Sequence, residues 1–295
     1  MRSMAFLLLA GCNMVRLATN QTADVLAVAA PSMAMEGDID LARDAAPGQL
    51  KTIEGFWLAS PDNRKLLRLL AQGYCEYTFG FIDSDLEAMT MAGRDDAETS
   101  KLRQRATGLY MRCMSYGLKL LGPSWEKAMK SDMSSFRETV AQAGKDDVEG
   151  MLFTALGLAS AINLNRDDLE LVASLPRAKI MLERIVQLDE RFNNAWAHTA
   201  LGLLYSSQGA AIGGDPAKGR VHFDRAIALT SGKYLMPKVL KAHTYAVITN
   251  DRKLFHDSLL DVLKTSASVW PEQRLANELA HVRANRYLTH EDDLF

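Results

Sequence analysis

The sequence predicts an all-α fold in which helical hairpins stack into a solenoid. Two observations predict this class. From residue 15 onward, apolar residues recur at three- and four-residue steps, which is typical of amphipathic helices. Turn-forming residues interrupt this pattern at short intervals, and no stretch of the sequence shows the sustained two-residue alternation of a strand. We therefore expect about ten or eleven helices joined by short turns.

The first twelve residues, MRSMAFLLLAGC, have the pattern of a short secretion signal. One basic residue, Arg2, precedes an apolar run that ends in small residues. The last four letters resemble the bacterial lipobox, in which the cysteine receives a diacylglycerol before the signal is cleaved. We expect residues 1–11 to be a signal peptide and Cys12 to be the lipidated first residue of the mature chain. The alternative is an apolar helix start with an incidental cysteine.

Turn signals divide the rest of the chain into helices. They supply N-cap acceptors, prolines at early helical positions and glycines at helix ends. The signals begin at Ser60, Gly93, Gly122, Gly144, Asn165, Gly213, Ser231 and Asn250. A length of 295 residues would allow two domains. Because no Ser/Gly linker separates two halves, we expect residues 12–295 to form a single helical domain.

Parts of the sequence match the tetratricopeptide pattern, in which paired helices pack closely through small residues. The matching residues are Ala178, Leu182, Ile185 and Leu188 in one helix, Leu201, Gly202 and Tyr205 in the next, and Gly219, Phe223 and Ala226 in the third. Trp196 lies two residues too early, and the loop at 208–216 is longer than the consensus turn. The expected fold is therefore a degenerate, tetratricopeptide-like solenoid.

Cys75 and Cys113 remain once Cys12 is assigned to lipid, and neither has a CxxC partner or a nearby histidine. Their midpoint falls in the turn that begins at Gly93, so they would lie level in an antiparallel hairpin. An oxidising compartment would permit a disulfide. Helix axes about 8–10 Å apart bring two Cα atoms within bonding range only in some orientations. We expect two buried, inert thiols, with a disulfide as the alternative.

The charge balance and the motifs exclude several functions. The chain has 34 Lys+Arg against 36 Asp+Glu, a formal net charge of −2, so nucleic acid is not an expected partner. The six histidines include no HExxH motif and no i,i+4 pair, and serine-nucleophile motifs are missing. Acidic pairs fall at turns and at the terminus, where helix capping explains them. We expect no catalytic residue, no metal and no cofactor.

Two groups of side chains are candidates for binding a ligand. Tyr74, Tyr77 and Phe81 fall on one face of a predicted helix. Core packing is the simpler explanation, and the alternative is an apolar groove or channel for a lipophilic small molecule. Asn163 and Arg166 offer amide and guanidinium donors in a turn, which is otherwise an ordinary helix C-terminus.

The glycine-rich loop at 208–216 is a candidate contact with a partner. Its residues Gly213, Gly214 and Asp215 lie between rigid helices, where inserted loops often bind other proteins. As a phosphate loop it fails, because Arg220 and Val221 stand where Lys and Ser/Thr are required. The simpler interpretation is that Asp215 caps the next helix, with Pro216 opening it.

Several short blocks follow one another along the chain: Asn20–Asp24, Ala59–Asn63, Ala161–Leu164, Leu175–Arg177, Gly213–Pro216, Leu275–Asn277 and Asp293–Phe295. Together they resemble the T component of tripartite ATP-independent periplasmic (TRAP) transporters, the TatT lipoproteins. The resemblance implies a tetratricopeptide-like fold, a lipid anchor at Cys12 and a homotrimer with pores. It also implies a complex with the periplasmic solute-binding protein of a TRAP transporter. It supplies no catalytic residue.

We expect a lipid-anchored periplasmic protein that binds this solute-binding protein and guides a hydrophobic or organic-acid ligand through the pore of the trimer. The alternative is a general cell-envelope scaffold that recruits assembly or secretion complexes and has no solute pathway. Asn13 follows Cys12 where an Asp would retain the lipoprotein at the inner membrane, so the enterobacterial sorting pattern favours the outer membrane.

Overall fold

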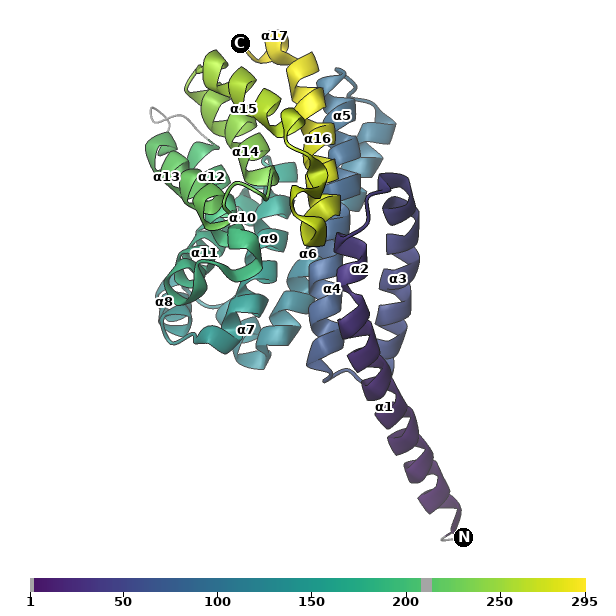
Figure 1. The fold of residues 1–295 in the computed structure, drawn as a ribbon. Helices are drawn as coiled ribbons and strands as arrows, with labels where there is room; N and C mark the ends of the chain where they lie inside the picture. Colours follow the sequence, from purple (N-terminus) through teal and green to yellow (C-terminus); the bar gives the residue numbers. More distant parts are fainter. Residues whose placement is uncertain (1–2, 208–213) are drawn as a thin grey trace.

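The computed structural model describes residues 3–207 and 214–295, and Figure 1 shows their arrangement. Most of these residues are helical and none of them forms a strand, which confirms the all-α prediction. The α-helices run from α1 to α17, more than the ten or eleven expected. The excess comes from single-turn helices such as α2 (Pro31–Ala34), α10 (Leu169–Val172) and α17 (Glu291–Leu294). A periodic pattern cannot reveal so short a helix, because one turn carries only one or two buried positions.

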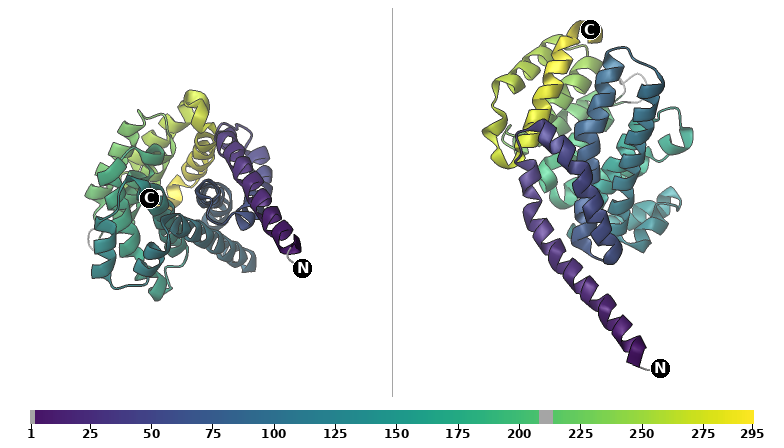
Figure 2. Two further views of the ribbon diagram at one scale, coloured as in Figure 1. Left: turned by 90° about the horizontal axis from the view of Figure 1, so that it is seen from below. Right: turned by 90° about the vertical axis from the view of Figure 1, so that its right-hand side faces the viewer.

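Helix α1 (Ser3–Ala29) begins well away from the body of the protein and joins it only along its second half (Figures 1 and 2). The amide oxygen of Asn20 accepts hydrogen bonds from Ser60 Oγ at 2.8 Å and from Asn63 Nδ2 at 2.7 Å. Ala23 is fully buried beside them. Cys12 lies on the part of α1 whose side chains are not described. Within the described residues, no helix is both long and apolar enough to cross a bilayer.

The first half of the body is built from long helices with carboxylate or amide caps. Its α-helices are α3 (Ile39–Ala59), α4 (Arg64–Tyr77), α5 (Asp83–Met91), α6 (Ala97–Leu121), α7 (Pro123–Ala128), α8 (Met133–Ala141) and α9 (Val148–Leu164). Asn63, Asp96 and Asp132 accept backbone N–H bonds at the starts of α4, α6 and α8. Between α4 and α5 the chain continues as a π-helix, η1 (Thr78–Ile82).

The second half continues the same pattern with α11 (Leu175–Asp189), α12 (Phe192–Ser206), α13 (Pro216–Leu229), α14 (Met236–Lys241), α15 (Arg252–Lys264) and α16 (Arg274–Thr289). A second π-helix, η4 (Ala242–Ala246), follows α14. The Asp215 carboxylate accepts the Lys218 N–H at 3.0 Å, and Pro216 opens α13. The predicted cap is therefore confirmed.

Helices pack closely where the repeat pattern places glycine. A Cβ on Gly202 of α12 would lie 2.8 Å from the ring of Phe223 on α13, and a Cβ on Gly219 would lie 3.0 Å from the Gly202 carbonyl. Ala178, Leu182 and Phe223 have no exposed surface at all. These contacts are those of stacked tetratricopeptide-like hairpins, in which small residues let two helices approach.

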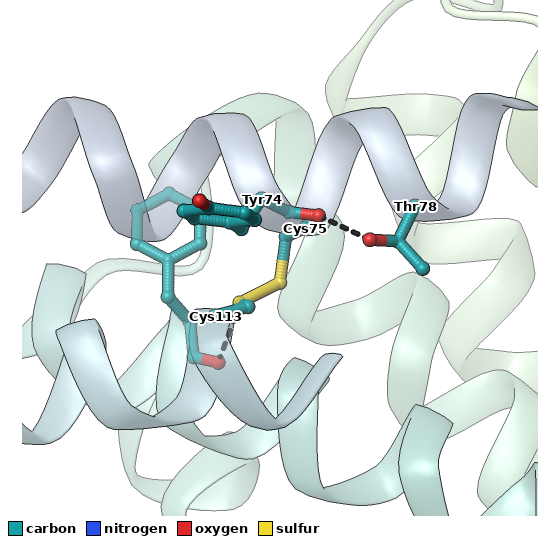
Figure 3. The surroundings of a disulfide bond; sticks show 5 residues. Tyr74, Cys75, Thr78 and Cys113 are labelled. Atoms are coloured by element: carbon teal, nitrogen blue, oxygen red, sulfur yellow. Dashed lines mark hydrogen bonds between the residues drawn. A yellow bond between two sulfur atoms is a disulfide. The ribbon is translucent and has the colours of Figure 1, made fainter. Parts of the chain in front are cut away.

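Cys75 and Cys113 form a disulfide between α4 and α6, so the expectation of two free thiols is wrong (Figure 3). Both side chains are buried, as expected, and their Cα atoms are 5.3 Å apart. Helix axes about 8–10 Å apart, each with Cα atoms about 2.3 Å from the axis, leave about 3.4–5.4 Å between two residues that face each other. The two cysteines satisfy this condition, because both lie on the facing surfaces of their helices.

The solenoid curves until its ends meet. The C-terminal helix α16 packs against α2 and α3 near the N-terminus, and these helices lie side by side in both views of Figure 2. The buried apolar residues fall into two clusters, one from Ala23 to Tyr205 together with Leu275, and one from Phe223 to Tyr287. The closing contact brings residues from opposite ends of the sequence to the same interior space.

Candidate functional site

A cavity of about 1130 Å³ lies inside this curve of helices. Its wall consists mostly of apolar side chains from α3, α4, η1, α9, α12, α14, η4 and α16. Pockets for small ligands usually measure about 300–1,000 Å³ and combine apolar walls with a few polar groups. This cavity is slightly larger than that range and has the same kind of lining.

Irregular backbone is concentrated in the wall of the cavity. The π-helix η1 contributes Phe79, Gly80 and Phe81, and the π-helix η4 contributes His243 and Thr244. π-Helices are rare and frequently lie at functional sites, because the extra residue turns side chains out of the regular helical pattern. The Thr78 hydroxyl donates to the Tyr74 carbonyl at 2.6 Å where η1 begins (Figure 3).

A third irregularity lies in α12, where the chain kinks next to the cavity. Asn193, Asn194 and Ala195 have φ of 47°, 57° and 59°, the left-handed region that non-glycine residues seldom enter. Both asparagines line the cavity, and so does Trp196 directly after the kink. Strained backbone of this kind persists only where the surrounding structure holds it, and it clusters at ligand sites.

Four of the five predicted ligand residues line the cavity. Tyr77 and Phe81 form part of the wall, with ring centroids 5.8 Å apart. Asn163 and Arg166 also belong to the lining; both are exposed, and the Arg166 guanidinium donates to the Asn163 amide oxygen. Tyr74 lies outside the lining. The structure therefore brings Tyr77, Phe81, Asn163 and Arg166 to one chamber, while their role in binding stays a prediction.

Tyr74 belongs instead to a polar cluster on the other side of α4. Its ring stacks on Tyr116 at 5.7 Å, and both hydroxyls donate to the Glu54 carboxylate, at 2.8 and 2.7 Å. Burial alone would raise the pKa of Glu54, but donors from Lys51, Tyr116 and Tyr74 outweigh it and lower the pKa. The expected single aromatic face is split, and Tyr74 supports the core rather than the chamber.

The predicted partner loop is only partly described. Gly213 lies outside the described residues, Gly214 is half-buried, and Asp215 is exposed while it caps α13. The contact of this loop with a partner stays a prediction.

Sequence patterns did not predict a network of charges at the junction of α5 and α16. The Glu87 carboxylate accepts from Arg286 at 2.6 Å and from the Tyr287 hydroxyl at 2.5 Å, across about 200 residues of sequence. Arg283 donates to the Phe79 carbonyl at 2.9 Å, and its guanidinium lies 4.2 Å from the Phe79 ring. Burial would raise the pKa of Glu87, but Arg283 and Tyr287 outweigh it and lower the pKa. This ionised network helps to hold the two ends of the solenoid together.

Sequence patterns also did not predict two further acidic groups on the cavity wall. Asp83 accepts the Tyr110 hydroxyl at 2.7 Å, and Glu76 accepts the Gln72 amide at 2.8 Å. Burial raises the pKa of both carboxyls. The side chain of Glu76 is accessible from the cavity although protein surrounds it. A signal was present in the sequence, because Glu76 interrupts the apolar stretch that runs from Tyr74 to Ile82.

The fold and the chamber together define a tetratricopeptide-like α-solenoid closed around an apolar cavity. This chain belongs to the TRAP transporter T-component family, whose model matches residues 35–295. It is also similar to an uncharacterized protein of Treponema pallidum (strain Nichols), with 22% identity over 308 residues that span 98% of this chain and 94% of that protein. The family match confirms the resemblance found in the sequence and associates the chain with TRAP transport, as a transport accessory protein.

Proposed function

We propose that this protein is a lipid-anchored periplasmic component of a TRAP system, which binds the solute-binding protein of that system and holds a lipophilic ligand in its cavity. The cavity of about 1130 Å³ is the observation that carries the proposal. A chamber of that size with apolar walls favours small-molecule binding over a purely scaffolding role. The family supplies the transport context.

The remaining parts of the proposal assign roles to particular residues. Lipid on Cys12 would tether the body through α1, whose first half extends away from the folded domain (Figure 1). Asn163 and Arg166, exposed on the cavity wall, would meet a ligand as it enters. The segment at Gly214 and Asp215 would contact the solute-binding protein. Assembly into a homotrimer would join the chambers of three copies around a pore.

Co-purification with the solute-binding protein encoded beside it tests the partner. The expected result is a complex visible by native mass spectrometry, with the T component present as a trimer. Asp215→Asn keeps the helix cap, because asparagine caps as well as aspartate, but removes the exposed charge. We expect this variant to weaken the complex without changing the melting temperature. Recovery of assembly or secretion factors in place of a solute-binding protein would contradict the proposal and favour a general scaffold.

Extraction of bound molecules tests the chamber separately. Ala276 lines the cavity and is half-buried, so Ala276→Phe should fill part of it. Ala141→Phe on the exposed end of α8 is the matched control. We expect a lipophilic molecule to accompany the wild type and the control and to be reduced severalfold in Ala276→Phe. Equal amounts in all three proteins would mean that the cavity does not hold the ligand.

A further inference from the structure

We propose that the cavity is built for an amphipathic ligand with an amine head, whose ammonium group lies against Glu76 and the aromatic rings beside it. This inference rests on the proposed role of the cavity in holding a ligand and specifies the chemistry of that ligand. It starts from a carboxylate that the protein itself leaves without a cation.

Three carboxylates from α4 and α5 belong to the cavity wall, and they differ in the partners that the protein gives them. Glu87 forms an ion pair with Arg286 at 2.6 Å and lies near Arg283. Asp83 accepts the Tyr110 hydroxyl and lies within the influence of the positive charge of Arg283. Glu76 accepts only the neutral amide of Gln72, and no ion pair joins it to a basic side chain in the part of the chain that the structure describes.

This isolation is costly for a carboxylate that protein surrounds. Burial raises the pKa of Glu76, because the ionised form loses hydration without gaining a positive neighbour. Its side chain remains accessible, however, because it faces the cavity. An ammonium group entering the cavity would supply the missing charge and form a charge-assisted hydrogen bond.

Aromatic rings complete the site. Phe79, Trp196 and Tyr234 all line the cavity; the Phe79 and Trp196 centroids are 5.4 Å apart, and those of Trp196 and Tyr234 are 6.3 Å apart. Trp196 Nε1 donates to the Tyr234 hydroxyl at 2.9 Å, which fixes both rings. Glu76 and Phe79 lie three residues apart where α4 continues into η1, and both line the cavity. The charge of Glu76 also helps to raise the pKa of the Tyr234 hydroxyl, after the larger effect of burial. A carboxylate beside aromatic rings is the combination that binds alkylammonium groups.

Most arginines of the wall already have a partner within the protein, so they offer fewer places for an organic anion. Arg283 is buried and committed to Glu87, the Phe79 carbonyl and the Phe79 ring. Arg68 pairs with Glu149 at 3.4 Å and Arg166 donates to the Asn163 amide oxygen, which leaves Arg103 as the remaining arginine of the lining. A carboxylate head placed beside Glu76 would meet a like charge. The expected order of affinity is therefore amine, then alcohol, then carboxylate.

Isothermal titration calorimetry with octylamine, 1-octanol and octanoate tests this order at neutral pH, where octylamine is protonated. Glu76→Gln removes the charge and keeps the shape, and Glu126→Gln, an exposed acid on α7, is the matched control. We expect octylamine to bind the wild type about tenfold more tightly than octanol, as a charge-assisted hydrogen bond allows. Glu76→Gln should abolish that preference, while Glu126→Gln should retain it.

The three probes separate this inference from the proposed function. Octanol reports on the apolar chamber alone, so octanol binding without a preference for octylamine would overturn the amine site and leave the chamber standing. Tightest binding of octanoate, or an octylamine affinity that Glu76→Gln leaves unchanged, would also overturn it. Failure of all three probes to bind would reject the amine site together with the ligand-holding role.

Discussion

Two regions of this all-helical protein differ in how closely their helices pack: the contact between α6 and α9, and the wall of the cavity. A Cβ on Gly157 would lie 2.6 Å from the Met114 nitrogen and the Tyr110 carbonyl, and a Cβ on Gly117 would lie 2.7 Å from the Thr154 nitrogen. Backbone therefore touches backbone between these two helices. The wall of the cavity, in contrast, includes two π-helices and the left-handed turn in α12, and its helices enclose an open volume. Glycines allow α6 and α9 to pack closely, whereas irregular backbone is found where the helices leave a cavity.

The disulfide ties one region to the other, since Cys75 of α4 lines the cavity and Cys113 belongs to α6. The bond closes a loop across 38 positions of sequence. Replacing both cysteines by alanine should lower the free energy of unfolding by about 4 kcal/mol, because the unfolded chain is released from that loop. Urea denaturation with and without reductant measures the effect. Reductant should not shift the midpoint of the double-alanine variant, and a wild-type midpoint that is insensitive to reductant would contradict the bond.

Glycine-to-alanine substitutions should destabilise the contact between α6 and α9 much more than the wall of the cavity. Gly157→Ala forces a methyl group against backbone that cannot move, so it should cost about 3 kcal/mol of unfolding free energy. Gly80→Ala in the cavity wall meets only the Leu279 Cδ1 atom, at 2.9 Å, and the cavity gives that side chain room to shift. Its cost should stay below about 1 kcal/mol.

Gly108 provides the control for both glycine variants. It lies in α6, like Gly117, but a Cβ there would meet nothing within 4 Å. Gly108→Ala should stabilise the protein by up to about 1 kcal/mol, because alanine favours the helix. Thermal or urea unfolding measures all three variants. Equal losses for Gly157→Ala and Gly80→Ala would mean that the two regions do not differ in packing.

Much of the close-packed region could be predicted from the sequence. The helical period, the cap at Asp215, and the glycines at 202 and 219 are local signals, and each appears in the structure as expected. The disulfide could not be settled, because the period places two cysteines level along a hairpin but does not fix the rotation of each helix. The missed disulfide is therefore a matter of helix orientation rather than of helix assignment.

The cavity could be predicted only in part. Tyr77 and Phe81 were found from spacing, but Tyr74, three residues before Tyr77 in the same regular helix, packs on Tyr116 and bonds Glu54 and so lies outside the lining. The pairing of Glu87 with Arg286 spans about 200 residues and has no local signal. Asn193 and Asn194 tolerate left-handed backbone, yet Ala195 in the same turn gives no such hint. Tertiary closure of the solenoid decides these features.

The smallest expected effect on stability comes from replacing Glu76, a charged residue of the cavity wall. Its raised pKa means that the folded state binds its proton more tightly than the unfolded state, whose carboxyl has a pKa of about 4.3. The carboxyl therefore contributes stability that is fully present below about pH 4 and is lost as the pH rises through the folded pKa. Glu76→Gln should match the wild type near pH 4 and become the more stable protein at pH 7. Since the side chain is accessible, solvent screening should keep the gain below about 1 kcal/mol.

Melting temperatures of both proteins between pH 4 and pH 7 measure this difference. Glu87→Gln is the informative comparison, because the same change there removes the partner of the buried Arg283 and the half-buried Arg286. The pKa of Glu87 is lowered, so its contribution runs the opposite way, and the variant should be the less stable protein at pH 7. A Glu76→Gln variant that loses stability as the pH rises from 4 to 7, relative to wild type, would show that a cation already neutralises this carboxylate. That outcome would remove the argument that Glu76 binds the ammonium group of a ligand.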